Sequence, residues 1–539
     1  MAITNSAFGP ARGLDFTAAR DGRHRRAQAA AGVEPVGPCL IGARPAPITH
    51  GDRVNASPSS DDIDSEFQKA VEHYQGNRFA EATALLDRLA PRCGGRAEYF
   101  RLRGHIAMRN RDPAAALTAL QRAAELAPRA AVHQFELGEH YRMSGKPADA
   151  IRQYRQALTL EPGAAVVRIA LAGVLALTGQ VRAALGEVDQ AVAAAGDNLQ
   201  ALLAAALAYR DLKQADAAIR TLRRASALRP DDLKIQAFLR ELYTSQVRPW
   251  HFRMMNDTAR NRAYDAAIRR AVGPTTHVLE IGTGSGLLSM MAARAGARLV
   301  STCEQVESIA ETAAEIVRRN GFGERVKVIP KRSTQLAIGV DLPERADILI
   351  SEILSDKLLE ESVLSSTAHA RRQLLKPNGV MIPRAIAAVV RLAGGDFLRE
   401  AAMVDRIEGF DLTPFNRFVP NSITLSMEAG QMESYSDDVE VFRFDLMADN
   451  HRPEERRLPV TARRTGTVIG LLQWLRLELD AVESFENRPT DTVTPSAWRQ
   501  VFYPFTQPVA LREGETLTLW AAHDLVSMAF APIVGSSEP

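Results

Sequence analysis

Two glutamates stand nine residues apart in the stretch SEILSDKLLEES, residues 351 to 362, which follows directly after the apolar run ADILI. This run has the length and composition of a buried strand, and ligands of open parallel sheets bind at the carboxyl ends of the strands. We therefore expect Glu352 and Glu361 at the rim of a ligand site. Two carboxylates suit a planar cation, because a guanidinium offers a fork of N–H donors that carboxylates can hold in a fixed orientation.

A glycine turn lies upstream of these acids, in EIGTGSG between the apolar run HVLEI and the helical pattern LLSMMAARAGA. Gly282, Gly284 and Gly286 let the backbone turn tightly and let a ligand approach without a Cβ in the way. Glu304 ends the following strand, 20 residues after Gly284, where an acid can accept hydrogen bonds from both hydroxyls of a ribose. The third glycine comes one residue too early for the dinucleotide pattern G-x-G-x-x-G.

The elements that must position these residues alternate between strand and helix after residue 245, which predicts a parallel sheet with helices on its faces. Before residue 245 the pattern is helical and repeats every 34 residues. Small residues recur at three positions of each repeat, and proline closes most repeats. The three sets of small residues are Gly104, Gly138, Ala172, Ala206; Ala116, Ala150, Ala184, Ala218; and Ala123, Ala157, Ala191, Ala225. Each repeat is therefore expected to be a pair of antiparallel helices that stacks on the next.

Length and composition bound the class of protein. A chain of 539 residues exceeds one hydrophobic core, and its 46% hydrophobic residues and net charge of +2 are typical of a globular protein with no marked preference for a charged partner. No basic stripe with interleaved aromatic residues indicates nucleic acid, and no run approaches the about 20 apolar residues of a membrane helix. Cys39, Cys93 and Cys303 lack CxxC spacing, which disfavours a zinc site or disulfide framework and favours the cytoplasm.

The repeats resemble the tetratricopeptide repeat family, which implies an α-solenoid with a groove for a protein partner, or else an internal spacer. The glycine turn, with the acid Glu280 before its first glycine, resembles that of class I S-adenosylmethionine-dependent methyltransferases, which have a Rossmann-like sheet. This resemblance implies S-adenosyl-L-methionine as the cofactor, held at its methionine part by the glycine turn. It also places Ser333 and Thr334, after the third strand region VKVIPKRSTQL, near the adenine.

The two glutamates together resemble the double-glutamate hairpin of the protein arginine N-methyltransferase family. WHFRMMNDTARNRAY, residues 250 to 264, is similar to that family's helix over the cofactor, which implies His251 and Met254 near the active site and Arg260 paired with the cofactor carboxylate. Residues 374 to 385 are similar to the turn that leaves the sheet, and residues 409 to 416 and 498 to 524 to the β-barrel that follows. The layout matches the branch of the family that carries tetratricopeptide repeats.

Four parts are predicted: a disordered leader (1–61), the repeat solenoid (62–245), the cofactor-binding methyltransferase domain (246–383) and a β-barrel (384–539) for substrate and dimerisation. The repeat-bearing branch carries a second methyltransferase-like module, which this sequence lacks, so the resemblance implies a homodimer. The expected activity is methylation of arginine in a substrate protein that the repeats recruit. No metal is expected to take part.

One departure from the family bears on activity: the family's Thr-His-Trp loop aligns with Ser496, Ala497 and Trp498, so its histidine is missing. Asp356, a third acid in the hairpin, is expected to face solvent, and His523 with Asp524 to form a structural hydrogen bond. Two alternatives stay open. One is a scaffold that binds the cofactor without turnover, and the other is a methyltransferase for another protein side chain, such as an amide or amino group. Amide enzymes typically carry Asn/Asp-Pro-Pro-Tyr after the fourth strand, where this sequence reads SEIL.

Overall fold

The computed structural model describes residues 60–425, 431–448, 450–489 and 496–533 of the chain. The predicted leader lies outside these ranges, except for Ser60 and Asp61, which begin the first helix. Among the described residues, no helix combines the length and the apolar character that a bilayer crossing requires.

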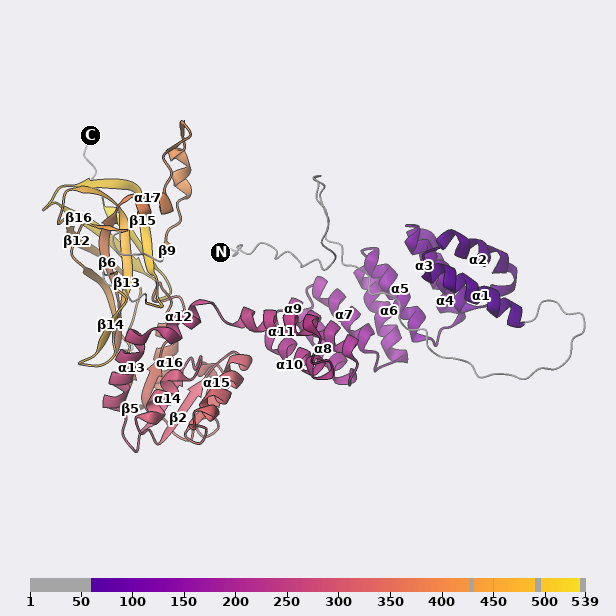
Figure 1. Ribbon diagram of the computed structural model, residues 1–539, viewed down its shortest axis with the longest axis horizontal. Coiled ribbons are helices and arrows are strands. Elements are labelled where there is room, and N and C mark those ends of the chain that lie inside the picture. Colours follow the sequence, from indigo (N-terminus) through magenta and orange to yellow (C-terminus); the bar gives the residue numbers. More distant parts are fainter. Residues whose placement is uncertain (1–59, 426–430, 449, 490–495, 534–539) are drawn as a thin grey trace, which may run out of the picture. The chain divides into compact units, whose positions relative to one another are not determined.

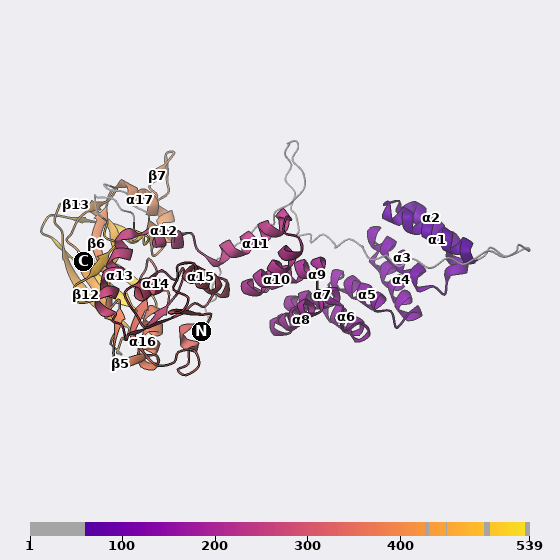
Figure 2. The ribbon, with the colours of Figure 1, turned by 60° about the horizontal axis from the view of Figure 1, so that its bottom comes forward.

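Helical pairs make up the N-terminal part of the described chain, and successive pairs lie side by side (Figure 2). The helices are α1 (Ser60–Gln75), α2 (Phe79–Cys93), α3 (Ala97–Arg109), α4 (Pro113–Leu126), α5 (Ala131–Met143), α6 (Pro147–Leu160), α7 (Ala165–Leu177), α8 (Val181–Ala194), α9 (Leu199–Asp211), α10 (Ala215–Leu228) and α11 (Leu233–Gln246). The predicted period thus appears as one helical pair per 34 residues. Pro128, Pro162 and Pro230 lie in the turns that follow α4, α6 and α10.

The small residues of the repeats lie where the two helices of a pair meet. Ala116, Ala150, Ala184 and Ala218 are completely buried. A Cβ built on Gly138 would come within 2.7 Å of the ring of Tyr154 on α6, and one on Gly104 within 2.8 Å of Leu120 on α4. These separations are too short for a side chain, so the predicted close approach of the helices is confirmed at both glycines.

A five-stranded parallel sheet follows the solenoid, in the order β3-β2-β1-β4-β5. Its strands are β1 (His277–Ile281), β2 (Leu299–Cys303), β3 (Val326–Ile329), β4 (Ala346–Ser351) and β5 (Leu375–Ile382), and the helical segments around them are α12 (Trp250–Asn256), α13 (Thr258–Ala271), α14 (Leu287–Arg294), α15 (Glu307–Arg319), η1 (Ser333–Gln335) and α16 (Val363–Gln373). The chain reverses strand order between β1 and β4, which is where open sheets of this kind bind ligands. Most of the segment predicted as a turn, residues 374 to 385, is β5 itself.

Antiparallel strands form the C-terminal part, in a sheet of order β10-β6-β13-β15-β9, with β11 and β14 as side strands, and a sheet β12-β16-β17 (Figure 1). The elements are β6 (Ala385–Gly394), α17 (Asp396–Ala402), β7 (Arg406–Ile407), β8 (Phe410–Asp411), η2 (Thr413–Phe418), β9 (Ile423–Leu425), β10 (Glu433–Ser434), β11 (Val439–Asp445), β12 (Glu454–Thr461), β13 (Gly466–Glu478), β14 (Ser484–Glu486), β15 (Gln500–Leu511), β16 (Thr516–His523) and β17 (Met528–Ile533). One hydrophobic core continues from the parallel sheet into these strands, so both parts hold the segments between them in place.

Candidate active site

The glycine turn joins β1 to α14 at the carboxyl end of the sheet. The backbone N–H groups of Gly282 and Thr283 donate to the carbonyl of Cys303, at 3.0 and 3.1 Å, which ties the turn to β2. Gly282 has a φ of +81°, and a Cβ there would come within 2.8 Å of Ile353. By contrast, a Cβ on Gly284 would meet no atom within 4 Å. The turn therefore packs against the β4 loop on one side and faces open space at Gly284.

Glu304 lies beside this turn, as the sequence predicts. One carboxylate oxygen accepts from the N–H of Gly284 at 3.3 Å, and the other from the N–H of Val306 at 3.0 Å. The side chain is partly exposed, so its remaining lone pairs can accept from a ligand. Its assignment to a ribose stays a prediction, and the geometry fits it.

Glu280 lies beneath the turn rather than in the open space. Its carboxylate accepts from the Thr302 hydroxyl at 2.9 Å and from the Ser289 hydroxyl, so it joins β1 to β2 and α14. Burial raises the pKa of Glu280 to about 7, with the two hydroxyls and Arg260 opposing the shift. The carboxylate thus supports the turn from below.

Arg260 lies on α13 and is almost completely buried. Nη1 donates to the Asn261 side chain at 2.7 Å, and Nη2 donates to Glu352 at 2.8 Å. The guanidinium lies 5.3 Å from the ring of Tyr264 and 5.9 Å from that of Trp498, within cation–π range. Its Nε–H is buried and has no hydrogen-bond partner among the residues that the structure describes. An arginine with one unsatisfied donor is a candidate receiver for an anionic group of a ligand.

Glu352 follows β4, and its side chain is 4% exposed. Burial raises the pKa of Glu352 to about 7, Arg260 opposes this shift, and the charge of Glu361 adds to it. Both predicted acids thus lie on the segment after β4, and the charge of Glu361 acts on Glu352. Glu361 is exposed, and partial burial raises its pKa, opposed by Arg248. The expected pair is therefore asymmetric, with one buried member and one open member.

The hairpin that carries these acids is fixed by the antiparallel part of the chain. Asp356 accepts from the backbone N–H of Arg499 at 2.8 Å and from its side chain at 3.1 and 3.2 Å. Trp498 donates its indole N–H to the carbonyl of Leu354 at 3.0 Å. The prediction that Asp356 faces solvent is wrong, because the carboxylate is the partner of a loop that lies 143 residues away in sequence.

Asp257 is a supporting residue that sequence reasoning missed. One oxygen caps α13 by accepting from the N–H of Arg260 at 3.0 Å. The other accepts from the Ser496 hydroxyl at 3.1 Å and the N–H of Ala497 at 3.0 Å. The loop that lacks the family's histidine thus still reaches the site through its backbone. The pattern Asp-Thr before an amphipathic segment is a helix-start signal that could have found the cap, although not its second role.

His251 and Met254 lie on α12, next to the same region. The imidazole of His251 stacks on Trp250 at 3.9 Å, and burial lowers its pKa, opposed by the nearby charge of Glu304. The carbonyl of Met254 lies 3.4 Å from Nη1 of Arg260. The structure therefore brings α12 next to Arg260.

Ser333 and Thr334 lie in η1 after β3, where Ser333 is buried and Thr334 is exposed. In the part of the chain that the structure describes, neither hydroxyl bonds to the glycine turn or to Glu304. Their predicted place near an adenine rests on the strand order alone.

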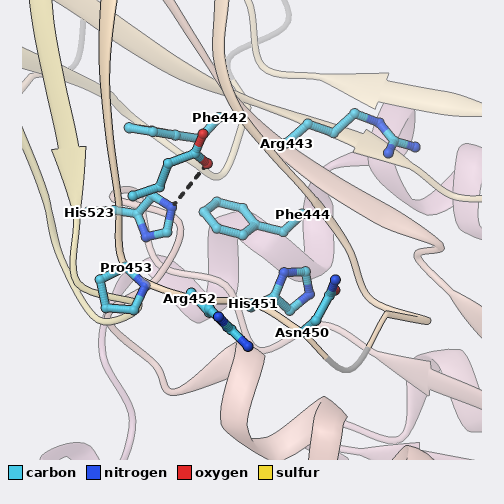
Figure 3. Close-up of a pocket in the computed structure, with 9 residues that line it drawn as sticks. Phe442, Arg443, Phe444, Asn450, His451, Arg452, Pro453 and His523 are labelled. Atoms are coloured by element: carbon cyan, nitrogen blue, oxygen red, sulfur yellow. Dashed lines mark ion pairs between the residues drawn. The ribbon is translucent and has the colours of Figure 1, made fainter.

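His523 and Asp524 do not form the expected hydrogen bond with each other. Asp524 caps the turn at Val526 and Ser527, and His523 lies 4.0 Å from Glu454. Figure 3 shows His523 edge-on to Phe442 and Phe444 in a hollow of the antiparallel part, at ring distances of 4.6 and 4.9 Å. No residue of the predicted site lines this hollow.

The fold and site define a class I methyltransferase with a solenoid in front of it, and the family comparisons agree. Residues 265–386 match the family model of the ribosomal protein L11 methyltransferase. Residues 141–208 and 199–232 match two models of the tetratricopeptide repeat, which confirms the repeats.

Among individual proteins, an arginine N(omega)-methyltransferase of Streptomyces achromogenes subsp. streptozoticus is 36% identical over 301 residues, which cover 55% of this chain and 83% of that protein. Protein arginine N-methyltransferase 7 of Drosophila grimshawi is 30% identical over 51% of this chain, and that of Oryza sativa subsp. indica 33% identical over the same share. The match spans less than half of these two relatives, 46% and 44%. The chain belongs to the arginine N-methyltransferase family.

Two solved structures are similar to about half of the chain. The Trypanosoma brucei PRMT1 enzyme-prozyme heterotetrameric complex with AdoHcy matches with a TM-score of 0.46 and 24% identity, over 52% of this chain and 88% of that one. Arabidopsis thaliana protein arginine methyltransferase 10 matches with a TM-score of 0.43 and 22% identity, over 50% and 86%.

Proposed function

We propose that this protein transfers a methyl group from S-adenosyl-L-methionine to a guanidinium nitrogen of arginine in a substrate protein. The observation that carries the proposal is the buried carboxylate of Glu352 at the carboxyl edge of the sheet, beside the glycine turn and on the same segment as Glu361. A lysine or amide enzyme has no comparable need for two carboxylates around one planar group.

The residues present fit the cofactor. The open space at Gly284 can take its methionine part, Glu304 offers acceptors for the ribose, and the buried Nε–H of Arg260 lacks a partner that a carboxylate would supply. When bound, the cofactor supplies an electrophilic methyl group on a sulfonium.

Glu352 and Glu361 would orient the guanidinium and balance its charge. Two like charges at about 4 Å cost roughly 4 kcal/mol at an effective dielectric constant near 20, so a cationic nucleophile beside a sulfonium needs negative charge close by. Arg260 already engages one oxygen of Glu352, which holds that carboxylate in place before substrate arrives. Such preorganisation aligns the nucleophile for an in-line displacement.

A homodimer is part of the proposal, and the segment between β6 and β9 supports it. We call residues 396–418 the arm; it comprises α17, the β7–β8 hairpin and η2. Its large apolar side chains are exposed: Ile407 50%, Phe410 71%, Phe415 66% and Phe418 68%. A cluster of this size on one projecting segment is typical of an interface, and we propose a second copy of this chain as its partner.

The solenoid is proposed to recruit the substrate protein. Val132 and Val166 occupy equivalent positions on α5 and α7, as do Met143 and Leu177, and all four are exposed. Equivalent positions of stacked repeats lie next to one another, so these residues form an apolar row suited to a peptide with apolar side chains. Binding there would raise the effective concentration of arginine at the site.

The buried thiols of Cys93 and Cys303 are free, which supports our placement of the protein in the reducing cytoplasm.

The proposal is tested with the purified chain, isotope-labelled S-adenosylmethionine and two peptides that differ only by arginine or lysine at one position. Methylarginine after hydrolysis of the first peptide, and no label on the second, is the expected result. Label on lysine, or on an amide of either peptide, would refute the assignment to arginine.

Free L-arginine is the second substrate to test, because the Streptomyces relative is named an arginine rather than a protein arginine methyltransferase. Label on free arginine with none on peptides or lysate proteins would keep the chemistry and move the substrate to a small molecule.

A further inference from the structure

Helix α15 begins at Glu307, three residues after Glu304, and it lacks a cap of its own. The residue before it, Val306, has no side-chain acceptor for the first N–H groups of the helix. These N–H groups belong to the segment that follows directly on the turn of Glu304. Whatever satisfies them therefore also helps to fix Glu304.

The missing acceptor comes from the solenoid. Asp216, in the first turn of α10, accepts from the N–H of Glu307 at 3.2 Å with one oxygen and from the N–H of Ser308 at 3.1 Å with the other. A carboxylate at this place satisfies two orphan donors and also interacts favourably with the positive end of the helix dipole.

Two ion pairs extend the same contact along both helices. Arg220 pairs with Glu307, and Arg223 pairs with Glu311 one turn further on. The side chains are 41 to 52% exposed, so each pair by itself adds little stability. Their three- and four-residue spacing places them on one face of each helix, which sets the register in which Asp216 meets α15.

We infer that Asp216 is a positioning residue for the cofactor site: by capping α15 from the solenoid it holds the segment 304–308, and with it Glu304 beside Gly284. The inference rests on the proposed function, because that function assigns Glu304 to the ribose of the cofactor. Glu352 and Glu361 lie on the hairpin after β4, and among the described residues no hydrogen bond or ion pair joins that hairpin to Asp216. Loss of the cap therefore weakens binding of the cofactor and not of the arginine substrate.

The test is calorimetric titration of the full-length chain with S-adenosylhomocysteine. Asp216→Ala should raise the Kd about 2- to 30-fold, the equivalent of the range for loss of a helix cap, and Asp216→Asn less, because an amide keeps one acceptor. The control is Asp197→Ala in the exposed turn before α9, which should bind like wild type. In steady-state assays the KM for S-adenosylmethionine should follow the Kd, while the KM for the arginine peptide stays constant.

Two further measurements separate this role from general destabilisation. Hydrogen exchange of the Glu307 and Ser308 amides should be faster in Asp216→Ala than in wild type, without faster exchange in the strands of the parallel sheet. Arg223→Glu and Glu311→Arg should each raise the Kd, and the double variant should restore it, because the ion pair is then re-formed with reversed polarity.

An unchanged Kd in Asp216→Ala, or the same rise of the Kd in Asp197→Ala, would overturn the inference. Binding of S-adenosylhomocysteine by wild type would still support the proposed function. An equal rise in the KM values of both substrates would also overturn it. If wild type failed to bind S-adenosylhomocysteine, the proposed function would fail and this inference with it.

Discussion

At the scale of the residue, the site depends on one buried ion pair. Arg260 and Glu352 are 3% and 4% exposed, and neither has another partner of opposite charge at this distance in the described residues. Such a pair adds little net stability, because the burial of its charges opposes their attraction. Glu361 has no such role, because it is open to solvent.

The two glutamates should therefore respond differently to the same substitution. At pH 8 Glu352→Gln is expected to raise the free energy of unfolding by about 1–3 kcal/mol, because burial of the ionised carboxylate costs more than its pairing with Arg260 returns, whereas Glu361→Gln, at an exposed site, should change it less. Both variants should lose at least about 100-fold in kcat/KM, because each removes a group that orients the guanidinium. Denaturant melts and steady-state assays measure the two effects. Equal changes in stability for the two variants would show that the burial of Glu352 does not determine its effect on stability.

The raised pKa of Glu352, about 7, predicts opposite effects of pH on stability and activity. Because the pKa is higher in the folded than in the unfolded state, protonation favours folding; this contribution is fully present below about pH 4 and is lost as pH rises to about 7. Binding a guanidinium requires the ionised form. We expect kcat/KM for the arginine peptide to rise with pH through a limb at or below about pH 7, since bound sulfonium lowers the pKa further.

The control for this limb is Glu280, whose pKa is also raised to about 7. Glu280→Gln should keep the limb if Glu352 causes it, because Glu280 lies beneath the turn and does not face the substrate. A pH-independent kcat/KM between pH 5 and 8 would contradict the assignment.

At the scale of the element, the glycines of the turn meet two different requirements: one needs room for close packing, and the other keeps space open for a ligand. Gly282 needs both its positive φ and the absence of a Cβ, because Ile353 lies within 2.8 Å of that position. Gly284 also has a positive φ, of +51°, yet a side chain there would meet only open space. One glycine thus serves packing and the other keeps the ligand space free.

Alanine at Gly282 and at Gly284 should therefore have different effects on stability and on affinity for the cofactor product. Gly282→Ala is expected to lower both stability and affinity for S-adenosylhomocysteine. Gly284→Ala should cost only about 1–2 kcal/mol of stability, from the left-handed backbone, and still lose most of the affinity. Thermal melts with and without ligand measure both. Normal affinity in Gly284→Ala would show that the cofactor does not lie over this turn.

The comparison of sequence and structure also belongs to this scale. Local patterns predicted the helical pairs, the glycine turn, the position of Glu304 and the place of Glu352 after the fourth strand. They could not predict that Asp356 binds Arg499, that Asp257 holds the loop at Ala497, or that Arg260 pairs with Glu352. Hydrophobic period and turn chemistry determine which face of an element is buried, whereas the partner of a charged side chain depends on segments more than 90 residues away.

At the scale of the whole molecule, the exposed apolar side chains of the arm lead us to predict a homodimer. The arm extends from the antiparallel part, and its hairpin is labelled β7 in Figure 2. Its apolar side chains lie on this hairpin and on η2, where they are exposed. Light scattering should give the mass of a dimer for wild type and of a monomer for Phe410→Asp combined with Phe415→Asp, since charge in an apolar interface is costly to bury. Leu233→Asp, at an equally exposed site in the solenoid, should leave the dimer intact. A monomeric wild type would refute the proposed homodimer.

The proposed role of the solenoid predicts that its variants affect methylation of proteins but not of short peptides. Val166→Glu combined with Leu177→Glu should reduce methylation of lysate proteins several-fold, while methylation of a short arginine peptide stays unchanged, because only the longer substrate reaches the apolar row. Val181→Glu is a suitable control, because Val181 is exposed on a second helix, α8, outside that row. Equal losses on both substrates would place the effect in the active site.

The claim on which the rest depends is that Glu352 and Glu361 hold one guanidinium in line with the methyl donor. A crystal structure of the full-length chain with S-adenosylhomocysteine and an arginine peptide tests it most directly. We predict both carboxylates within about 2.7–3.2 Å of the guanidinium nitrogens, and the Nε–H of Arg260 on the cofactor carboxylate. A guanidinium bound elsewhere, or Glu361 turned away from it, would contradict the account.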